Sequence, residues 1–195
     1  MIGPATPTPS AHTTPVAASA WVQRWSHLLP DQGHVLDVAS GSGRHLQWFA
    51  QRGHPVTGID RNEQAVAATR QWGEVFLADI ENNTWPLLQN GQPRQFDAVV
   101  VTNYLWRPLF PTLLQSLKIG GVLLYETFAQ GNEDYGKPSR PDFLLQPGEL
   151  LQRCAGLHVV AYENGLEAAP ARVVQRIAAI RPGPDSLSRM PHYPI

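Results

Sequence analysis

Residues 35–45 read VLDVASGSGRH, and this stretch carries the clearest fold signal of the chain. A short apolar run, typical of a buried strand, leads directly into small residues and then into a helical pattern. Glycines at such a place let the backbone pass close to a bound ligand, where a Cβ atom would collide with it. The free N–H groups at the start of the following helix can meet an acidic group. The stretch therefore predicts a strand, a ligand-binding loop and a helix, in that order.

Around this stretch, short apolar runs alternate with helical periods, which is typical of a parallel sheet covered by helices. The expected strands comprise residues 34–38, 55–59, 75–78, 96–101 and 122–127. Between them, the periodicity and the capping residues predict helices over residues 44–52 and 62–72, the second capped by Asn62, and a helix that carries Leu109, Leu113, Leu114 and Leu117 and ends at Gly120-Gly121. Residues 82–95 contain turn signals, so any helix there is short.

The first and last parts of the domain have separate signals. Trp21, Trp25, Leu28 and Leu29 recur at the spacing of an amphipathic helix. Residues 128–146 are irregular, and a helix then begins at Pro147 and ends near Gly156. Two strands, residues 157–162 and 172–180, are expected to pair antiparallel through a turn that contains Asn164-Gly165. The sequence thus predicts an α/β, Rossmann-like fold with a seven-stranded, mostly parallel sheet and an antiparallel C-terminal strand.

The chain has 195 residues, the size of one domain, so we expect one active site. Residues 1–18 are rich in Pro, Thr and Ala and predict a flexible tail, because they offer little apolar surface to offset the entropy of ordering. Residues 19–180 form the expected domain, and residues 181–195 form a second Pro-rich tail.

Composition excludes several classes of partner. The formal net charge is −1 and no basic stripe is present, so nucleic acid is not an expected partner. The single cysteine, Cys154, allows no internal disulfide and fits a reducing compartment. The sequence shows neither a signal-peptide pattern nor an apolar run long enough to span a membrane, so we expect a cytoplasmic protein. The seven histidines lack metal-ligand spacing, and no metal site is expected.

Acidic residues at the strand ends point to an adenosine site. Asp60 closes the second strand 19 positions after Gly41, where a carboxylate can accept both hydroxyls of a ribose. Asp79 ends the third strand, beside Ile80. Because the carboxyl ends of parallel strands meet at one edge of a sheet, these acids and the glycine loop should form one rim.

Two nucleotide chemistries compete for this site. A dinucleotide fold requires a small residue where this chain has Leu46, so that the helix packs tightly and the pyrophosphate reaches its N-terminus. Asp37 would also repel a pyrophosphate, whereas it can face a cationic amino group. The sulfonium cofactor S-adenosylmethionine therefore fits better than a nicotinamide dinucleotide.

At this point the sequence resembles the class I S-adenosylmethionine-dependent methyltransferases, and among them the small tellurite-resistance-type enzymes. The family motif, acid-x-G-x-G-x-G, resembles residues 37–43 with Ala39 in place of the first glycine. Similar segments are residues 56–62, 78–80, 96–103 and 117–121, so the resemblance spans residues 21–180. It implies a class I methyltransferase fold with S-adenosylmethionine as cofactor, bound by Asp37, Ala39, Ser40, Gly41, Ser42, Gly43, Arg44, Asp60, Arg61, Asp79, Ile80, Thr102 and Asn103.

By the same resemblance, each part of the cofactor has a partner. Gly41 and Gly43 would let the methionine part lie against the backbone, and Asp37 would hold its ammonium group. Asp60 would hold the ribose, and Asp79 would reach the adenine amino group. Arg44 and His45 could instead be exposed residues of the first helical turn.

Methyl transfer is an in-line displacement that an enzyme promotes mainly by placing the acceptor and excluding water, so a catalytic base is not required. Residues 128–146 form an irregular segment of the length usual for a lid, which we expect to cover the acceptor. The candidates for catalytic, substrate-side residues are Asn103, Tyr104 and Tyr135, with Asn132 and Glu126 close to the same region in sequence.

The resulting hypothesis is an S-adenosylmethionine-dependent methyltransferase acting on a small-molecule or metalloid acceptor. The alternatives are a non-catalytic partner protein that binds the same cofactor, and a nicotinamide-dependent oxidoreductase. The identity of the acceptor and the oligomeric state stay open at this point.

Overall fold

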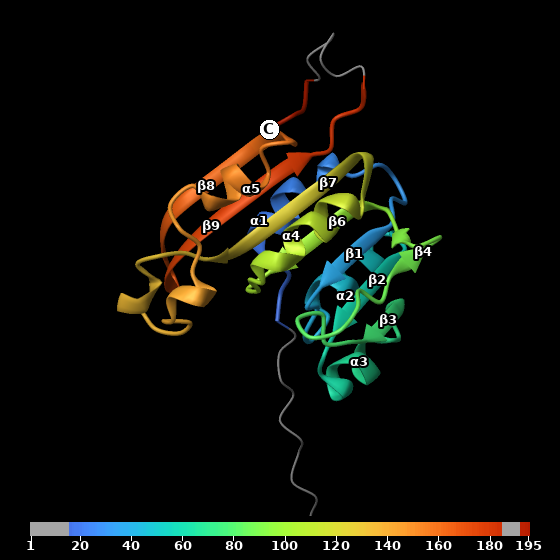
Figure 1. The fold of residues 1–195 in the computed structure, drawn as a ribbon, viewed down its shortest axis with the longest axis horizontal. Helices are drawn as coiled ribbons and strands as arrows, with labels where there is room; N and C mark the ends of the chain where they lie inside the picture. Colours follow the sequence, from blue (N-terminus) through green and yellow to red (C-terminus); the bar gives the residue numbers. More distant parts are fainter. Residues whose placement is uncertain (1–15, 185–191) are drawn as a thin grey trace, which may run out of the picture.

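The computed structural model describes residues 16–184 and 192–195. A seven-stranded sheet with the order β3-β2-β1-β6-β7-β9-β8 runs through the molecule (Figure 1). Its strands are β1 Val35–Val38, β2 Val56–Asp60, β3 Glu74–Leu77, β6 Phe96–Thr102, β7 Leu117–Phe128, β8 His158–Ala168 and β9 Ala171–Ile180. The first five are parallel, and β9 runs antiparallel to both of its neighbours. The predicted fold class and the antiparallel C-terminal pair are therefore confirmed.

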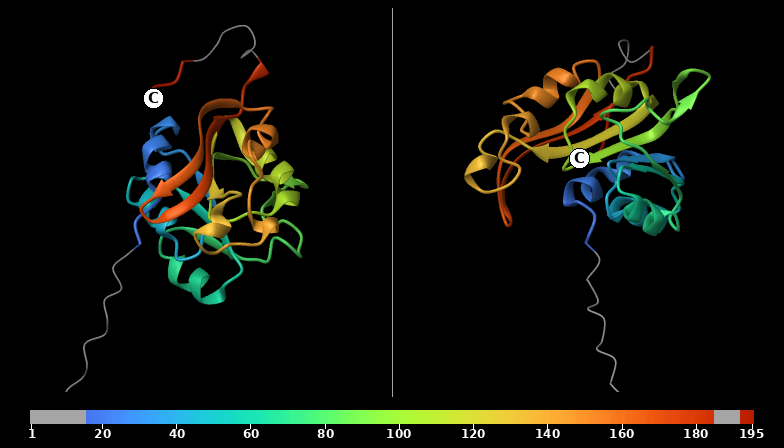
Figure 2. Two further views of the ribbon diagram at one scale, coloured as in Figure 1. Left: turned by 90° about the vertical axis from the view of Figure 1, so that its left-hand side faces the viewer. Right: turned by 60° about the horizontal axis from the view of Figure 1, so that its bottom comes forward.

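Helices cover both faces of this sheet (Figure 2). The three helices α1 Ala20–Trp25, α2 Arg44–Ala50 and α3 Glu63–Thr69 pack their apolar side chains against one face. The two helices α4 Phe110–Gln115 and α5 Glu149–Arg153 cover the other. Short 3-10 turns complete the set: η1 Ser26–Leu28, η2 Arg107–Leu109, η3 Asn132–Asp134 and η4 Pro141–Phe143.

Local sequence explains several of the element ends. The side chain of Asn62 accepts a hydrogen bond from the Ala65 N–H at 2.9 Å, which confirms the predicted cap of α3. Ser19 caps α1 in the same way, by accepting from the Trp21 N–H. Cys154, at the C-terminal end of α5, is fully buried, and burial raises the pKa of its thiol to about 12. This cysteine therefore packs as an apolar residue.

Residues 82–95, where turn signals allowed at most a short helix, contain no helix. In this segment the structure has the two-residue strands β4 Leu88–Gln89 and β5 Gln92–Pro93, paired antiparallel. Asn90 and Gly91 connect them, and both adopt positive φ angles of 52° and 75°. Asn-Gly is the preferred pair for such a two-residue hairpin turn, so the decisive signal was local turn chemistry.

The predicted helix through Leu117 was also too long. The α4 helix ends at Gln115, and Leu117 already belongs to β7, where it lies opposite Phe96. Gly120 adopts a φ of 78° within this strand, next to an irregularity in the pairing with β6. The glycine pair thus lies inside a strand, because pairing with β6 begins several residues earlier than the apolar run suggests.

The turn between the last two strands lies elsewhere than predicted. Asn164 and Gly165 lie within β8, opposite Gln175 and Val174, and Ala169-Pro170 makes the connection. Ion pairs extend the ladder beyond the predicted turn, because Arg176 on β9 contacts Glu163 at 3.2 Å and Glu167 at 2.8 Å on β8. Opposite charges on paired strands stabilise the longer hairpin.

Most of the predicted N-terminal tail and part of the C-terminal one, residues 1–15 and 185–191, lie outside the described residues. At the far end of the chain, the Tyr193 ring packs against His158 on β8 with centroids 5.3 Å apart. The Pro194 carbonyl lies 3.1 Å from a ring nitrogen of His27. In the parts that the structure describes, every helix is too short or too polar to cross a membrane.

Candidate functional site

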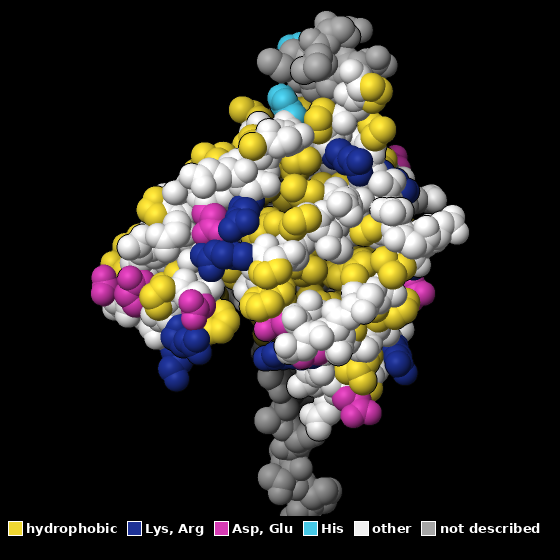
Figure 3. Space-filling view, in the orientation of Figure 1, with side chains coloured by type: hydrophobic (Ala, Val, Ile, Leu, Met, Phe, Trp, Pro, Cys, Tyr) yellow, Lys and Arg dark blue, Asp and Glu magenta, His cyan; other side chains and the backbone are white. Residues whose placement is uncertain are grey.

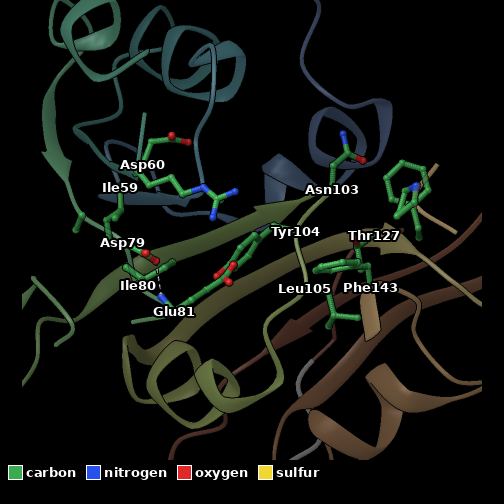
Figure 4. Close-up of a pocket in the computed structure, with 15 residues that line it drawn as sticks. Ile59, Asp60, Asp79, Ile80, Glu81, Asn103, Tyr104, Leu105, Thr127 and Phe143 are labelled. Carbon is green, nitrogen blue, oxygen red and sulfur yellow. Dashed lines mark hydrogen bonds between the residues drawn. The ribbon is translucent and has the colours of Figure 1, made fainter. Parts of the chain in front are cut away.

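A cleft of about 330 Å³ opens at the carboxyl edge of the parallel strands. The space-filling view is hollowed between the loop after β7 and the side of the molecule that carries β1 to β3 (Figure 3). The cleft is lined from the ends of five strands and from the loop after β7 (Figure 4), by Ala39, Ile59, Asp60, Arg61, Ala78, Asp79, Ile80, Glu81, Asn103, Tyr104, Leu105, Thr127, Phe128, Pro138 and Phe143. Parallel strands bring these distant residues to one edge.

The loop after β1 uses three residues with positive φ angles. Ala39 adopts 54°, which is costly for a residue with a Cβ atom, and Gly41 and Gly43 adopt 52° and 73°. A Cβ atom added at Gly41 would meet no described atom within 4 Å, whereas one added at Gly43 would lie 2.4 Å from the Thr69 Cγ2 atom. Gly41 therefore borders open space, and Gly43 serves the close packing of α2 against α3.

Two buried polar atoms in this segment lack partners. Oδ2 of Asp37 and Oγ of Ser40 are buried and accept or donate no hydrogen bond within the described residues. His45 lies nearest to the carboxylate, with Nδ1 at 3.7 Å from Oδ2, and its Nε2 accepts a hydrogen bond from the Ser19 N–H. The alternative of an exposed His45, left open by the sequence, does not hold, since only 2% of its surface is exposed. Unpaired buried oxygens suit an incoming cationic donor.

Asp60 ties the glycine loop to the end of β2. Its Oδ2 accepts a hydrogen bond from the Gly41 N–H at 2.7 Å, and its Oδ1 accepts from the Asn62 N–H at 2.8 Å. A carboxylate oxygen can accept more than one hydrogen bond, so both oxygens keep capacity for a ligand hydroxyl. Figure 4 shows Asp60 on the same wall of the cleft as Asp79.

Asp79, Ile80 and Glu81 form the wall at the end of β3. Hydrogen bonds from the Asn82 side chain and from the Glu81 N–H hold the pKa of Asp79 below its usual value. Asp79 is therefore a carboxylate near neutral pH, beside the apolar surface of Ile80. This wall can accept a hydrogen bond from an amino group and pack against a flat ring.

Tyr104 and Asn103 follow the central strand β6. Burial, together with the negative charge of Glu81, raises the pKa of Tyr104 well above its usual range, so its hydroxyl stays protonated. That hydroxyl is buried and has no hydrogen-bond partner in the described part of the chain. Asn103 adopts a φ of 54°, and its Oδ1 accepts from the Arg172 guanidinium at 3.5 Å. Its amide N–H groups can then face a ligand.

The structure gathers about half of the predicted site residues around the cleft. Seven of them line it, namely Ala39, Asp60, Arg61, Asp79, Ile80, Asn103 and Tyr104. Asp37, Ser40, Gly41, Ser42, Gly43, Arg44 and Thr102 belong to β1, the glycine loop, the start of α2 and the end of β6, but do not line the cavity. Arg44 instead donates to the Thr102 hydroxyl at 3.4 Å. Tyr135 is 49% exposed and is not among the residues that line the cleft.

Glu126 and Asn132, which lie close in sequence to the substrate-side candidates, are buried and bind other parts of the protein. Glu126 is 1% exposed and pairs with Arg176 at 2.7 Å and Arg172 at 3.5 Å. Asn132 is 2% exposed, donates to the Pro138 carbonyl at 2.9 Å and accepts from the Val173 N–H at 3.1 Å. Asn132 thus fixes the loop after β7 to strand β9.

Several residues that line the cleft were not among the predicted site residues. Ile59 and Ala78 are ordinary strand residues, and Glu81 and Leu105 follow predicted strand ends by only a few positions. Thr127 and Phe128 close β7, where the strand-end rule could have found them. Pro138 and Phe143 reach the cleft only because the loop folds back, for which the sequence holds no periodic signal.

The far end of that loop is anchored by Arg107. Its guanidinium binds both carboxylate oxygens of Glu149 at 2.8 and 2.9 Å and donates to the carbonyls of Asp142 and Leu144. Burial alone would raise the pKa of Glu149, but hydrogen bonds from Arg107 and from the Gln146 N–H hold this pKa below its usual value of 4.5. A bidentate ion pair of this kind fixes the loop in one orientation.

Replacing Arg107 with alanine is expected to lower the free energy of unfolding by about 2 kcal/mol at pH 7. The depressed pKa of Glu149 stabilises the fold above pH 4.5, and this contribution is lost as the pH falls through the folded-state value. The difference between wild type and variant should therefore shrink in urea unfolding below about pH 4. Arg153→Ala, which removes a longer 3.3 Å contact to the same carboxylate, is the control. An Arg107 effect that is equal at pH 3 and pH 7 would contradict the assignment.

Parts of the chain match known proteins in sequence. Residues 35–121 match the family model described as "Methyltransferase domain". The chain is 31% identical over 121 residues to YqeM of Bacillus subtilis, a match that covers 54% of this chain and 47% of YqeM. It therefore spans about half the length of that relative.

Solved structures share the fold. TehB from Haemophilus influenzae superimposes with a TM-score of 0.68 and 19% identity, covering 87% of this chain and 64% of TehB. A TehB-like SAM-dependent methyltransferase from Corynebacterium glutamicum superimposes with a TM-score of 0.58 and 17% identity, covering 83% and 86% of the two chains. The domain match and the shared fold together confirm the resemblance to class I S-adenosylmethionine-dependent methyltransferases.

Proposed function

We propose that this chain, which has the fold of the class I S-adenosylmethionine-dependent methyltransferases, transfers a methyl group from that cofactor to a small-molecule or metalloid acceptor. The observation that carries the proposal is the unpaired, buried oxygen of Asp37 beside a glycine loop that borders open space. An uncompensated carboxylate oxygen in the interior is costly, and a cationic amino group bound there would offset that cost. A pyrophosphate would increase it.

Residues of the glycine segment and of the cleft would bind different parts of the cofactor. Asp37 and Ser40 would meet the amino-acid part of the cofactor, Asp60 the ribose, and Asp79 with Ile80 the adenine. When bound, S-adenosylmethionine supplies an electrophilic methyl group on a positively charged sulfur. The carboxylates of Asp60, Asp79 and Glu81 give this half of the cleft a negative potential that suits a cation.

The acceptor side lies at the ends of β6 and β7. Asn103, Thr127 and Phe128 come from these strand ends, and Pro138 and Phe143 cover them from the loop. An acceptor atom held there would take the methyl group that bound S-adenosylmethionine supplies: its lone pair would form the new bond, and the electron pair of the broken C–S bond would stay on sulfur. A proton carried by the acceptor would leave to water, so no base is needed. Tyr104, which stays protonated, would serve as a hydrogen-bond donor.

Two calorimetric titrations separate this proposal from a nicotinamide-dependent oxidoreductase. S-Adenosylhomocysteine is expected to bind the full chain, and NAD is expected not to bind. Binding of NAD alone would overturn the proposal. A methyl-transfer assay over thiols, amines, carboxylates, tellurite and selenite then separates an enzyme from a non-catalytic partner protein, because only an enzyme would consume the cofactor in the presence of an acceptor.

The domain limits and the location belong to the same proposal. We place the catalytic domain at residues 19–180, since the buried contacts of Ser19 and of β9 lie at its two ends. The single cysteine, free and buried, agrees with a protein of a reducing compartment such as the cytoplasm.

The loop of residues 128–146 is proposed to act as a lid over the acceptor. Phe143 is 42% exposed and lines the cleft, so Phe143→Ala should lower kcat/KM about tenfold through lost acceptor contact while leaving S-adenosylhomocysteine affinity unchanged. Hydrogen exchange should show the loop protected only when S-adenosylhomocysteine and acceptor are both bound.

Tyr135 tests how far this lid moves. Tyr135 is a predicted substrate-side residue, so Tyr135→Ala should reduce methyl transfer, yet the ring is half exposed and does not line the cleft. A reduced rate would therefore require closure of the loop in the complex. Unchanged turnover in both variants would remove the lid proposal.

A further inference from the structure

The cleft continues into an outer hollow beneath the loop after β7. Four residues line both spaces, namely Asn103, Phe128, Pro138 and Phe143. Asn103 adopts a positive φ, and the Arg172 guanidinium lies 3.5 Å from its Oδ1. Because its Oδ1 accepts from that cation, its amide N–H groups can donate at the junction of the two spaces.

The two spaces carry opposite charge. The acidic residues that line the inner part are Asp60, Asp79 and Glu81, with Arg61 as the single basic one. The outer part is lined by Lys137 and Arg140 and by no acidic residue of the described chain. Figure 3 shows dark blue side chains at the end of this loop, next to the hollow, with magenta side chains beside them. The inner half thus suits a cation and the outer half an anion.

The basic residues are held on a fixed piece of backbone. The Pro138 carbonyl, between Lys137 and Arg140, accepts a hydrogen bond from the buried Asn132 side chain. Arg140 contacts Asp142 at 2.8 Å and lies over the Phe143 ring at 5.3 Å from its centre. Lys137 has no ion pair with any described residue. Its charge is available to a ligand.

Phe128 and Phe143 give the same hollow an aromatic lining, and Pro138 adds a rigid apolar surface. Such walls favour a flat apolar body over a fully hydrated ion, because burial of apolar surface contributes to binding. A bare inorganic oxyanion would leave these walls without a partner.

We propose that the acceptor is a small molecule with a planar apolar body and an anionic group such as a carboxylate, the anion held by Lys137 and Arg140 and the reacting atom placed beside Asn103. This inference rests on the proposed function, since it takes the inner half as the cofactor site. It narrows the acceptor class from any small molecule or metalloid to aromatic anions.

The test measures binding of matched probes to the full chain saturated with S-adenosylhomocysteine. Benzoate and benzamide have the same ring and differ in charge, and ligand-observed NMR titration yields a Kd for each. Benzoate is expected to bind about fivefold more tightly than benzamide, the effect of two partly exposed charges. In a double variant Lys137→Gln and Arg140→Gln, the Kd for benzoate should rise about fivefold and that for benzamide should stay unchanged.

Arg70→Gln is the matched control, because it removes one positive charge from the end of α3, away from the residues that line either space. Equal affinity for the two probes, or an Arg70→Gln effect as large as that of the double variant, would overturn the inference. Loss of S-adenosylhomocysteine binding in wild type would instead overturn the proposed function. A matching assay with a hydroxybenzoate and its amide as methyl acceptors should show the same preference in KM.

Discussion

Replacing Gly41 with valine should weaken S-adenosylhomocysteine binding at least about 100-fold, which corresponds to about 3 kcal/mol. The Cβ position at Gly41 faces open space, with no described atom within 4 Å, on the loop that joins β1 to α2. In the proposed complex this space is filled by the cofactor, so branched carbons would occupy it. Calorimetric titration of the variant measures the loss.

The stability of the same variant should change much less. Valine at a φ of 52° costs about 1–2 kcal/mol of conformational strain, but its Cβ atom has no described atom within 4 Å. The melting midpoint should therefore fall by only a few degrees, about 2–8 °C. Gly43→Ala provides the contrast, since its Cβ would lie 2.4 Å from Thr69 and should destabilise the fold. If Gly41→Val melts early and still binds, the glycine serves the turn alone.

Replacing Asp60 with alanine should weaken S-adenosylhomocysteine binding by about 2–3 kcal/mol, a factor of about 30 to 150, through loss of charge-assisted hydrogen bonds to the ribose. The structure indicates a second reason why Asp60→Ala should weaken binding. Because Asp60 also accepts from the Gly41 and Asn62 N–H groups, its removal loosens the glycine loop.

Two variants separate these contributions. Asp60→Asn keeps the shape and one accepting oxygen but removes the charge, and it should recover part of the affinity. Asn62→Ala removes the cap of α3 at a cost of about 1 kcal/mol in stability and leaves the carboxylate in place. Asp60→Ala with wild-type affinity, measured by the same titration, would rule out the ribose assignment.

The inner half of the cleft was predictable because it depends on strand order alone. Ala39, Asp60, Asp79 and Asn103 each follow a recognisable apolar run, and parallel pairing brings the ends of these runs to one edge. No knowledge of side-chain packing is needed for that step. The residues expected to bind adenosine therefore line one cleft although they are far apart in the sequence.

The outer half was not predictable in this way. Phe143 and Pro138 reach the cleft because Asn132 and Arg107 tie the two ends of the loop to β9 and α5, and such contacts leave no periodic trace. Tyr135, an aromatic residue of the same loop, looked equally suitable in sequence but is half exposed. Tertiary contacts decide which of these aromatic rings faces inward.

The prediction of a turn at Asn164-Gly165 failed for a related reason. Asn164-Gly165 has the composition of a tight turn, but the charges of Arg176 and Glu163 favour continued pairing across it. The sequence left open that His45 is an exposed residue of the first helical turn, but its ring is buried and accepts a hydrogen bond from the Ser19 N–H. Propensity describes single segments, and contacts between segments overrode it at both positions.

The closeness of Gly43 to Thr69 has an evolutionary consequence. Since the methyl group of Thr69 fills the space that any larger residue at position 43 would need, position 43 cannot change while Thr69 is present. An alanine at position 43 becomes acceptable only after Thr69 has given way to a smaller residue such as serine or glycine. Thr69, which does not line the cleft, thereby restricts the substitutions that evolution can introduce into the glycine loop.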